Sequence, residues 1–300
     1  MADAIEVAAA ILGDLATRDA PFGELTTYRV GGRAALRVVV PDEPALEIVA
    51  AACRESEIAV VALGRGSNTL VADRGFDGLV VMLGDAFATV EIEGTAVRAG
   101  GAASLPVVAR TTAAAGLRGF EWAVGVPGSI GGAVRMNAGG HGSDMAAVLR
   151  RIRVVDLGSG KDVVVSAAEL DLGYRHSALT TADIVVWAEL ELRHGDAAGA
   201  EEEIASIVRW RRANQPGGQN AGSVFTNPEG DSAGRLIDAA GLKGFRVGTA
   251  HVSEKHANFI QADDGGSADD VLALMHSVVE RVREETGVVL QPEVRLVGFA

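Results

Sequence analysis

The sequence predicts an α+β protein with two or three domains. Strand and helix patterns are mixed along the 300 residues without strict βαβ alternation. This length corresponds to two domains at roughly 150 residues each. Apolar residues make up 48% of the chain and aromatic residues only 4%, so Ala, Val, Leu and Ile must fill the core. The 38 glycines gather in clusters, which makes those clusters the candidate functional loops.

The elements of the first half follow from apolar periodicity, β-branched runs and the glycines that interrupt them. We expect helices over residues 5–17, 44–56 and 105–115, with Gly116 ending the third. We expect strands over residues 35–40, 58–63, 79–83, 90–92 and 96–99. Cys53 lies in the second helix and is interpreted as a buried structural thiol.

The second half begins with a predicted hairpin, residues 152–156 and 163–165 around Gly158–Gly160, and a strand over 183–192. Small residues predict a linker over 196–200. The helix expected over 200–213 places Glu201, Glu202 and Glu203 in its first turn and Arg209, Arg211 and Arg212 in its last, as the helix dipole favours. A helix over 268–286, capped by Ser267 and ended by Gly287, precedes a closing strand over 294–299.

Charge and composition exclude several classes of protein. The net charge of −13, with no basic patch, argues against binding nucleic acid, so an anionic ligand must be held by backbone N–H groups and a few placed Arg or Lys. One cysteine cannot form an intramolecular disulfide. The sequence shows neither the basic leader typical of a signal peptide nor the run of roughly 20 apolar residues typical of a membrane span. We expect a soluble cytoplasmic protein without a metal, because the six histidines show no convincing metal spacing.

The first glycine loop is Gly64–Thr69, after the predicted strand 58–63. It begins like a Rossmann fingerprint, but Thr69 stands where the third glycine belongs, and strand residues follow instead of a helix. Because the fingerprint needs a helix N-terminus for the pyrophosphate, we reject a classical dinucleotide fold. The loop is either an anion-binding nest of amide groups or an ordinary tight turn.

The second glycine tract is Gly125–Gly142, with seven glycines and no acidic residue in eighteen positions. Ordering glycine costs conformational entropy, so this density needs a reason. Pro127, Ile130 and Met136 are not typical of a flexible linker. The tract therefore favours close approach of backbone to a large flat or anionic ligand.

The two tracts and several later segments resemble the UDP-N-acetylenolpyruvoylglucosamine reductases, also called UDP-N-acetylmuramate dehydrogenases or the MurB family. The resemblance covers nearly the whole chain. Its segments, in order, are Thr26–Gly32, Gly64–Val71, Gly125–Gly142, Gly173–Ser177, Gly222–Pro228, Ala233–Asp238, Val252–Phe259 and Pro292–Arg295. Each is modest alone, but their order makes the resemblance specific.

The resemblance implies a two-lobed FAD-binding domain of the vanillyl-alcohol-oxidase (PCMH) type plus a C-terminal α+β substrate-binding domain. It divides the chain into a first FAD lobe (1–85), a second FAD lobe (86–200), a substrate domain (201–286) and a closing strand (287–300). Non-covalent FAD would take its pyrophosphate contacts near 66–68 and 128–132, with the isoalloxazine against 137–142. The implied cofactor-binding residues are Gly64, Arg65, Gly66, Ser67, Asn68, Thr69, Pro127, Gly128, Ser129, Gly131, Gly132, Asn137, Ala138, Gly139 and Gly142.

By resemblance, three residues carry the chemistry: Arg175 holds the substrate carboxylate, Ser223 donates a proton to the α carbon, and Glu293 stabilises the enolate. A carboxyl group beside a developing anion helps only when protonated, so a raised pKa is expected for Glu293. From local sequence alone, a surface Arg, a turn Ser and an exposed Glu remain open alternatives.

Arg211, Lys255 and Asn227 are the implied substrate contacts, with solvated surface residues as the alternative. The chain resembles the family's second type, because about ten residues separate Arg175 from the strand at Trp187 and neither Tyr28 nor Tyr174 can form the tyrosine lid. His141, Thr226 and Asn214 depart from common family residues.

The implied reaction is NADPH-dependent reduction of UDP-N-acetylglucosamine enolpyruvate in peptidoglycan precursor synthesis, hence in cell-wall biogenesis and cell division. The assignment of NADPH as electron donor rests on the resemblance alone, since no separate NADPH-binding motif is evident. A carbohydrate oxidase on the same scaffold and a non-catalytic flavin or nucleotide-sugar sensor are alternatives. The sensor gives no reason for Arg175, Ser223 and Glu293 to occur together, and many such oxidases tether FAD through a His or Cys.

Overall fold

Residues 2–299, which the computed structural model describes, contribute to two units that are each discontinuous in sequence. Unit 1 contains residues up to Asp19, Ala35–Arg65 and Asp77–Arg211. Unit 2 contains Ala20–Ala34, Gly66–Phe76 and the residues from Arg212 onward. The boundary at Arg65 divides the first glycine loop between the units. The four-part division expected from the sequence stays a prediction.

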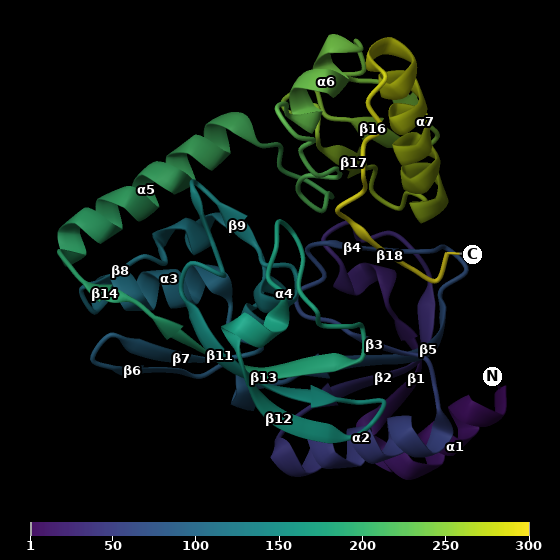
Figure 1. The fold of residues 1–300 in the computed structure, drawn as a ribbon. Coiled ribbons are helices and arrows are strands. Elements are labelled where there is room, and N and C mark those ends of the chain that lie inside the picture. Colours follow the sequence, from purple (N-terminus) through teal and green to yellow (C-terminus); the bar gives the residue numbers. More distant parts are fainter. Residues whose placement is uncertain (1, 300) are drawn as a thin grey trace. The chain divides into compact units, whose positions relative to one another are not determined.

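The first sheet, which belongs mainly to unit 1, has the strand order β1-β2-β5-β3. Its strands are β1 (Ala16–Pro21), β2 (Arg33–Val40), β3 (Val60–Ala62) and β5 (Phe76–Leu83), and β3 runs parallel to β5. Helices α1 (Ala2–Leu12) and α2 (Glu43–Ser56) lie side by side against it and share its apolar core (Figure 1). The expected helix 5–17 is too long, because Gly13 adopts φ +52° and the chain then enters β1.

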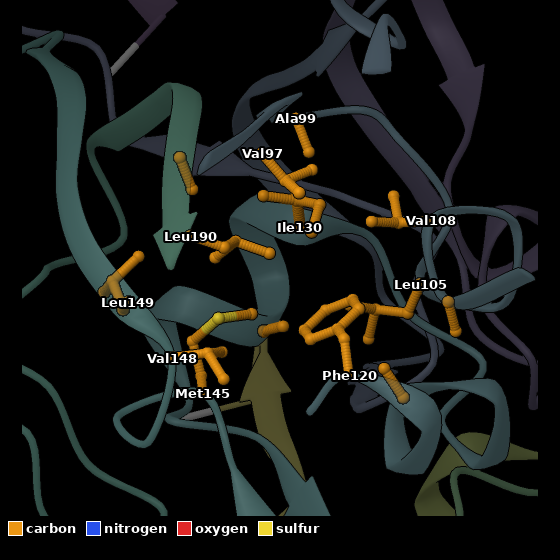
Figure 2. Close-up of a cluster of buried hydrophobic side chains, with 14 of the residues drawn as sticks. Val97, Ala99, Leu105, Val108, Phe120, Ile130, Met145, Val148, Leu149 and Leu190 are labelled. Carbon is orange, nitrogen blue, oxygen red and sulfur yellow. The ribbon is translucent and has the colours of Figure 1, made fainter. Parts of the chain in front are cut away.

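The second sheet is antiparallel, with the order β12-β11-β13-β7-β6. Its strands are β6 (Val90–Glu93), β7 (Ala96–Gly100), β11 (Leu149–Asp156), β12 (Lys161–Ser166) and β13 (Asp183–Glu191). This confirms the predicted hairpin. Helices α3 (Leu105–Ala114) and α4 (Ile130–Arg135) contribute Leu105, Val108 and Ile130 to a core shared with Phe120 and Leu190 (Figure 2). Two short pairs complete the unit, β8 (Leu117–Arg118) with β14 (Arg193–His194) and β9 (Gly139–Gly140) with β10 (Ser143–Asp144).

Helix α5 (Ala197–Asn214) replaces the predicted linker. Asp196 begins it, since its carboxylate accepts a hydrogen bond from the Gly199 N–H at 2.8 Å. The glutamates expected in the first turn therefore lie one turn further along. The prediction failed because small residues such as Ala197 and Ala198 suit a helix when a cap precedes them.

Unit 2 is a small α+β assembly. Its three-stranded sheet has the order β15-β16-β17, formed by Arg246–Val247, Ala250–Val252 and Ile260–Ala262. Helix α6 (Ala233–Ala239) and the long α7 (Ala268–Thr286) bury apolar side chains against it. The apolar stripe of α7 is buried, formed by Val271, Leu274, Met275, Val278 and Val282, and Gly287 ends the helix at φ +74°, as expected. The predicted closing strand is shorter and forms β18 (Arg295–Val297), which pairs in parallel with β4 (Thr69–Val71).

In the described part of the chain, short 3₁₀ helices complete the secondary structure, at Gly13–Leu15, Gly23–Leu25, Asp85–Phe87, Glu121–Gly125 and Ala167–Leu170. Among residues 2–299, no helix combines the length and apolarity needed to cross a membrane.

Asp73, just after β4, caps the start of α7. Its carboxylate accepts from the Ser267 hydroxyl at 2.6 Å, the Ala268 N–H at 2.9 Å and the Asp269 N–H at 3.1 Å. These bonds satisfy amide groups that a helix leaves without an internal partner. They also connect segments separated by about two-thirds of the chain.

We predict that Asp73→Ala lowers the free energy of unfolding by about 1–2 kcal/mol, because it removes a helix cap. Asp269→Ala, which removes an exposed carboxylate of the same turn, should change it by no more than about 0.5 kcal/mol. Urea denaturation, with hydrogen exchange of the first turn of α7, measures both. Equal effects of the two substitutions would contradict the assignment of Asp73 as a cap.

Candidate active site

The first glycine loop passes from unit 1 into unit 2 at Gly66, which has φ +61°. A Cβ added there would lie 2.5 Å from the Leu25 carbonyl oxygen, so only glycine fits. The absence of a helix after the loop is confirmed, because Thr69 begins β4. Within residues 2–299, the N–H groups of Gly66 and Ser67 donate to no protein group. They are the amide donors that an anion nest requires.

Thr27 lies beside this loop in unit 2, and its N–H donates to the Gly66 carbonyl at 3.1 Å. Its hydroxyl oxygen is buried and has no hydrogen-bond partner among the described residues. An orphaned buried hydroxyl is uncommon in proteins and is explained by an absent ligand or water. A polar ligand at this loop would satisfy it. The sequence analysis gave Thr27 no role.

In unit 1, the start of the loop meets the second glycine tract. A Cβ on Gly64 would lie 2.4 Å from the Ser129 hydroxyl oxygen, which is buried. The two tracts singled out in the sequence therefore touch. Arg65 and Pro127 are exposed on either side of this contact.

Most amide groups at Gly128–Gly132 are used within unit 1. The Gly128 N–H donates to Val126, the Ile130 N–H to Ala103 and the Gly131 N–H to Gly101, all at 2.9 Å. The N–H of the exposed Gly132 donates a long bond, 3.4 Å, to the Ser129 hydroxyl. Glycine density here thus serves close packing as well as any ligand. The assignment of Gly128 and Gly131 to the pyrophosphate stays a prediction.

Asn137 joins the tract to the segment that carries Arg175. The side chain, 3% exposed, donates to the Gly173 carbonyl at 2.8 Å and accepts from the Ala146 N–H at 2.9 Å. A longer bond of 3.4 Å reaches the Asp144 carboxylate. Its backbone is left-handed, with φ 39°, a region that Asn tolerates better than most residues. The Asn137 side chain is therefore committed to bracing the site.

Arg175 is half-buried and held in an unusual conformation. Its φ is 57°, and its guanidinium donates to the Gly139 carbonyl at 3.0 Å while lying 5.1 Å from the centre of the Tyr174 ring. Left-handed backbone at a non-glycine residue costs free energy and concentrates at functional sites. The structure thus places Arg175 beside the glycine tract, and its predicted contact with the substrate carboxylate stays a prediction.

The end of the tract offers open backbone. Added Cβ atoms at Gly140 and Gly142 would meet nothing within 4 Å, whereas one at Gly139 would lie 2.6 Å from Asp144. The His141 ring packs edge-to-face on Trp210 of α5 at 5.1 Å. Burial, and then the positive charge of Arg211, lower the pKa of His141. Burial also lowers the pKa of Arg211. An anion near this cluster would offset both effects.

In unit 2, Ser223 and Glu293 lie on adjacent backbone segments. The Glu293 N–H donates to the Val224 carbonyl at 2.8 Å, and the Thr226 N–H donates to the Gln291 carbonyl at 2.9 Å. An isolated antiparallel bridge pairs Phe225 with Pro292. Ser223 and Glu293 are both half-buried. Two residues 70 positions apart are thereby brought side by side.

Asn68 connects the first glycine loop with the backbone segment that carries Glu293. Its side-chain amide donates to the Glu293 carbonyl at 3.1 Å, and its own carbonyl accepts from the Arg295 N–H at 2.9 Å. This pairing continues into the parallel β4–β18 ladder. A residue predicted for cofactor binding thus also fixes the backbone of a predicted catalytic residue.

Asn258 is a buried polar residue to which the sequence analysis gave no role, although its segment was recognised. It is 4% exposed and bonds to both backbone groups of Phe225. The sequence feature that could have identified Asn258 as a structural residue is its single amide side chain inside the otherwise apolar run Ala257–Ile260.

The predicted substrate contacts have protein partners. Lys255 Nζ donates to the Arg212 carbonyl at 2.6 Å in the last turn of α5. The Asn227 side-chain oxygen accepts from the Ala233 N–H at 3.1 Å at the start of α6. Both residues lie in unit 2, whereas Arg211 belongs to unit 1. Their contacts with substrate stay predictions.

Cys53 and the metal-ligating residue types offer no further site among residues 2–299. Cys53 is buried, as predicted, and burial raises its thiol pKa to about 12. In the part of the chain that the structure describes, no group of three or more His, Cys, Asp or Glu side chains could hold a metal ion.

Each unit has features that suit one part of a cofactor with a diphosphate and a flat ring. In unit 2, the amides of Gly66 and Ser67 and the orphaned Thr27 hydroxyl suit phosphate oxygens. In unit 1, the open backbone at Gly140 and Gly142 admits a ring face. The α+β fold with its two units and these site features indicate the class of flavin-dependent oxidoreductases. Residues 34–166 match the FAD binding domain, and residues 214–297 match the C-terminal domain of UDP-N-acetylenolpyruvoylglucosamine reductase.

Relatives cover nearly the whole chain. A UDP-N-acetylenolpyruvoylglucosamine reductase from Heliobacterium modesticaldum is 44% identical over 93% of this chain and 89% of its own. One from Symbiobacterium thermophilum is 43% identical over 94% and 92%. The crystal structure of the Thermus caldophilus enzyme is 36% identical, covers 92% of this chain and 97% of its own, and superposes with a TM-score of 0.80. The chain belongs to the UDP-N-acetylenolpyruvoylglucosamine reductase family.

We predict that Asn137→Leu lowers the free energy of unfolding by about 2–4 kcal/mol and reduces bound flavin, because it leaves buried hydrogen-bonding groups without partners. Asn137→Gly keeps the left-handed backbone accessible and should retain more flavin than Asn137→Ala. Visible absorbance per chain measures flavin, and Asn214→Ala at the exposed end of α5 is the control. Full flavin content in Asn137→Leu would refute the bracing role.

Proposed function

We propose that this protein is an FAD-dependent reductase that converts UDP-N-acetylglucosamine enolpyruvate to UDP-N-acetylmuramate for peptidoglycan precursor synthesis. The observation that carries the proposal is the backbone pairing that sets Ser223 beside Glu293 in unit 2 of a chain belonging to this family. A serine hydroxyl can supply the proton that an enolate carbon accepts, and a neutral carboxyl group beside it can stabilise the enolate by a hydrogen bond. The direct test is whether the purified protein is yellow and consumes NADPH only when this substrate is present.

The reaction requires a hydride at the terminal vinyl carbon and a proton at the α carbon. When bound, FAD supplies the hydride. As the carbon–carbon π bond breaks, negative charge develops on the α carbon and its carboxylate, which needs donors placed in advance. Arg175 would hold that carboxylate, since guanidinium binds carboxylates in bidentate fashion. Ser223 would give its hydroxyl proton to the α carbon and recover one from solvent.

Glu293 would act in its protonated form. A charged carboxylate would repel the developing enolate, whereas a neutral carboxylic acid donates a hydrogen bond to it. The Glu293 backbone is fixed at both its N–H, by Val224, and its carbonyl, by Asn68. This fixation limits how far the side chain can move away from Ser223.

The UDP part of the substrate would meet positive charge without an extended basic surface. Arg211 is half-buried with a pKa lowered by burial, so a diphosphate would restore favourable electrostatics there. Lys255 and Asn227 would leave their present protein partners to contact the substrate.

We further propose that NADPH is the electron donor and that the chain belongs to the second family type, without the tyrosine lid. We also propose a cytoplasmic location, with neither nucleic acid nor membrane as partner.

We predict that Ser223→Ala gives folded, yellow protein whose reduced flavin is reoxidised by substrate about 100-fold or more slowly, because the proton donor is lost. Reduction of the flavin by NADPH should stay within a few-fold of wild type. Stopped-flow absorbance separates the two half-reactions, and Ser277→Ala on α7 is the control. Normal reoxidation by Ser223→Ala would exclude Ser223 as the donor.

Glu293→Gln tests the protonated carboxyl group. If Glu293 must carry a proton, the wild-type rate falls as pH rises through its pKa, since only the acid form donates. Glutamine donates at every pH, so the variant should lose this fall while keeping a measurable rate. Steady-state rates across pH measure the difference. An unchanged pH profile would show that the fall belongs to another group.

A further inference from the structure

The Asn258 side chain forms the hydrogen bonds that a neighbouring β-strand would form with the backbone of Phe225. Its side-chain oxygen accepts from the Phe225 N–H at 3.0 Å, and its side-chain nitrogen donates to the Phe225 carbonyl at 2.8 Å. Its own carbonyl accepts from the Val224 N–H at 2.9 Å. One planar amide thus provides the donor and acceptor that a peptide group would provide in a sheet.

The segment held in this way lies between Asn258 and the chain that carries Glu293. Phe225 sends both its backbone groups to Asn258, while Val224 and Thr226 bond to Gln291–Glu293. Phe225 is 1% exposed, so no water replaces these bonds. The backbone one residue after Ser223 is therefore fixed on both edges inside unit 2.

Ser223 follows a glycine turn. Gly222 has φ +77°, a Cβ there would meet nothing within 4 Å, and its N–H donates to the Asn220 side chain at 3.0 Å. Side-chain packing around Gly222 does not fix the turn, so the position of the Ser223 hydroxyl depends on the backbone hydrogen bonds on either side of it, and those that follow it are in the buried segment. We propose that Asn258 is a positioning residue that holds Ser223 at the distance from Glu293 needed for proton transfer. This proposal rests on the proposed function of Ser223.

The chemistry of the site explains why asparagine is required. Leucine would leave the Phe225 N–H and carbonyl buried without partners. Aspartate keeps the acceptor but donates only when protonated. Because Glu293 is proposed to make the wild-type rate rise as pH falls as well, the comparison is the ratio of the two rates. The rate of Asn258→Asp relative to wild type should rise as pH falls, whereas a loss of packing alone has no reason to change this ratio with pH.

The test is a double-mutant cycle on the holoenzyme, with flavin reduced anaerobically by dithionite and reoxidised by the enolpyruvyl substrate. Asn258→Leu should slow reoxidation about 100-fold in the Ser223 enzyme, the scale of a 1 Å misplacement. In the Ser223→Ala background the same substitution should change the rate by no more than about threefold, because the donor it positions is absent. Ser277→Ala, whose hydroxyl donates to the Ala273 carbonyl one turn back in α7, is the control and should reoxidise normally.

The outcomes separate the two proposals. If Ser223→Ala reoxidises at the wild-type rate, Ser223 is not the proton donor and the role of Asn258 falls with it. If Ser223→Ala is slow but the losses from the two substitutions multiply, only the role of Asn258 is overturned. Should Asn258→Leu not fold, Asn258→Asp decides by its pH dependence relative to wild type, and a ratio of the two rates that does not rise with falling pH overturns the proposal.

Discussion

The pairing of Val224–Thr226 with Gln291–Glu293 is the constraint on which the candidate chemistry depends. These few backbone hydrogen bonds bring Ser223 and Glu293 together without placing either side chain in regular secondary structure. Asn68 extends the pairing from the first glycine loop, so the loop proposed to bind phosphate and the segment proposed to protonate substrate share one backbone network. Proton transfer depends steeply on distance, which makes such fixation valuable.

Glycine serves two physical purposes in unit 1 and the adjoining loop. At Gly64 and Gly139, a Cβ would collide with Ser129 or Asp144, so the absence of a side chain permits close packing. At Gly140 and Gly142 nothing lies nearby, so the backbone is open to a ligand. The left-handed residues Asn137, His141 and Arg175 surround the same stretch. Some of the left-handed backbone at non-glycine residues thus lies where ligand contact is expected.

Each unit uses one buried asparagine as an internal brace. Asn137 connects the glycine tract with Gly173, two residues before Arg175, and Asn258 supports the backbone after Ser223. Asparagine suits this task because its neutral amide both donates and accepts, and it avoids the cost of burying a charge. The proposed catalytic side chains are therefore placed by neighbours that need not touch substrate.

The sequence by itself determined the fold class, the glycine tracts, the capped helix α7 and the family, because glycine clusters, apolar periodicity and ordered motifs are local signals. It did not reveal α5 starting at Ala197 or the short α4, since small residues and glycines mask helices that caps and packing stabilise. Only the tertiary structure decided that Gly64 touches Ser129, that Asn68 holds Glu293 and that Asn258 replaces a strand. These contacts join residues up to 225 positions apart, and no local pattern encodes which distant groups will satisfy a buried amide.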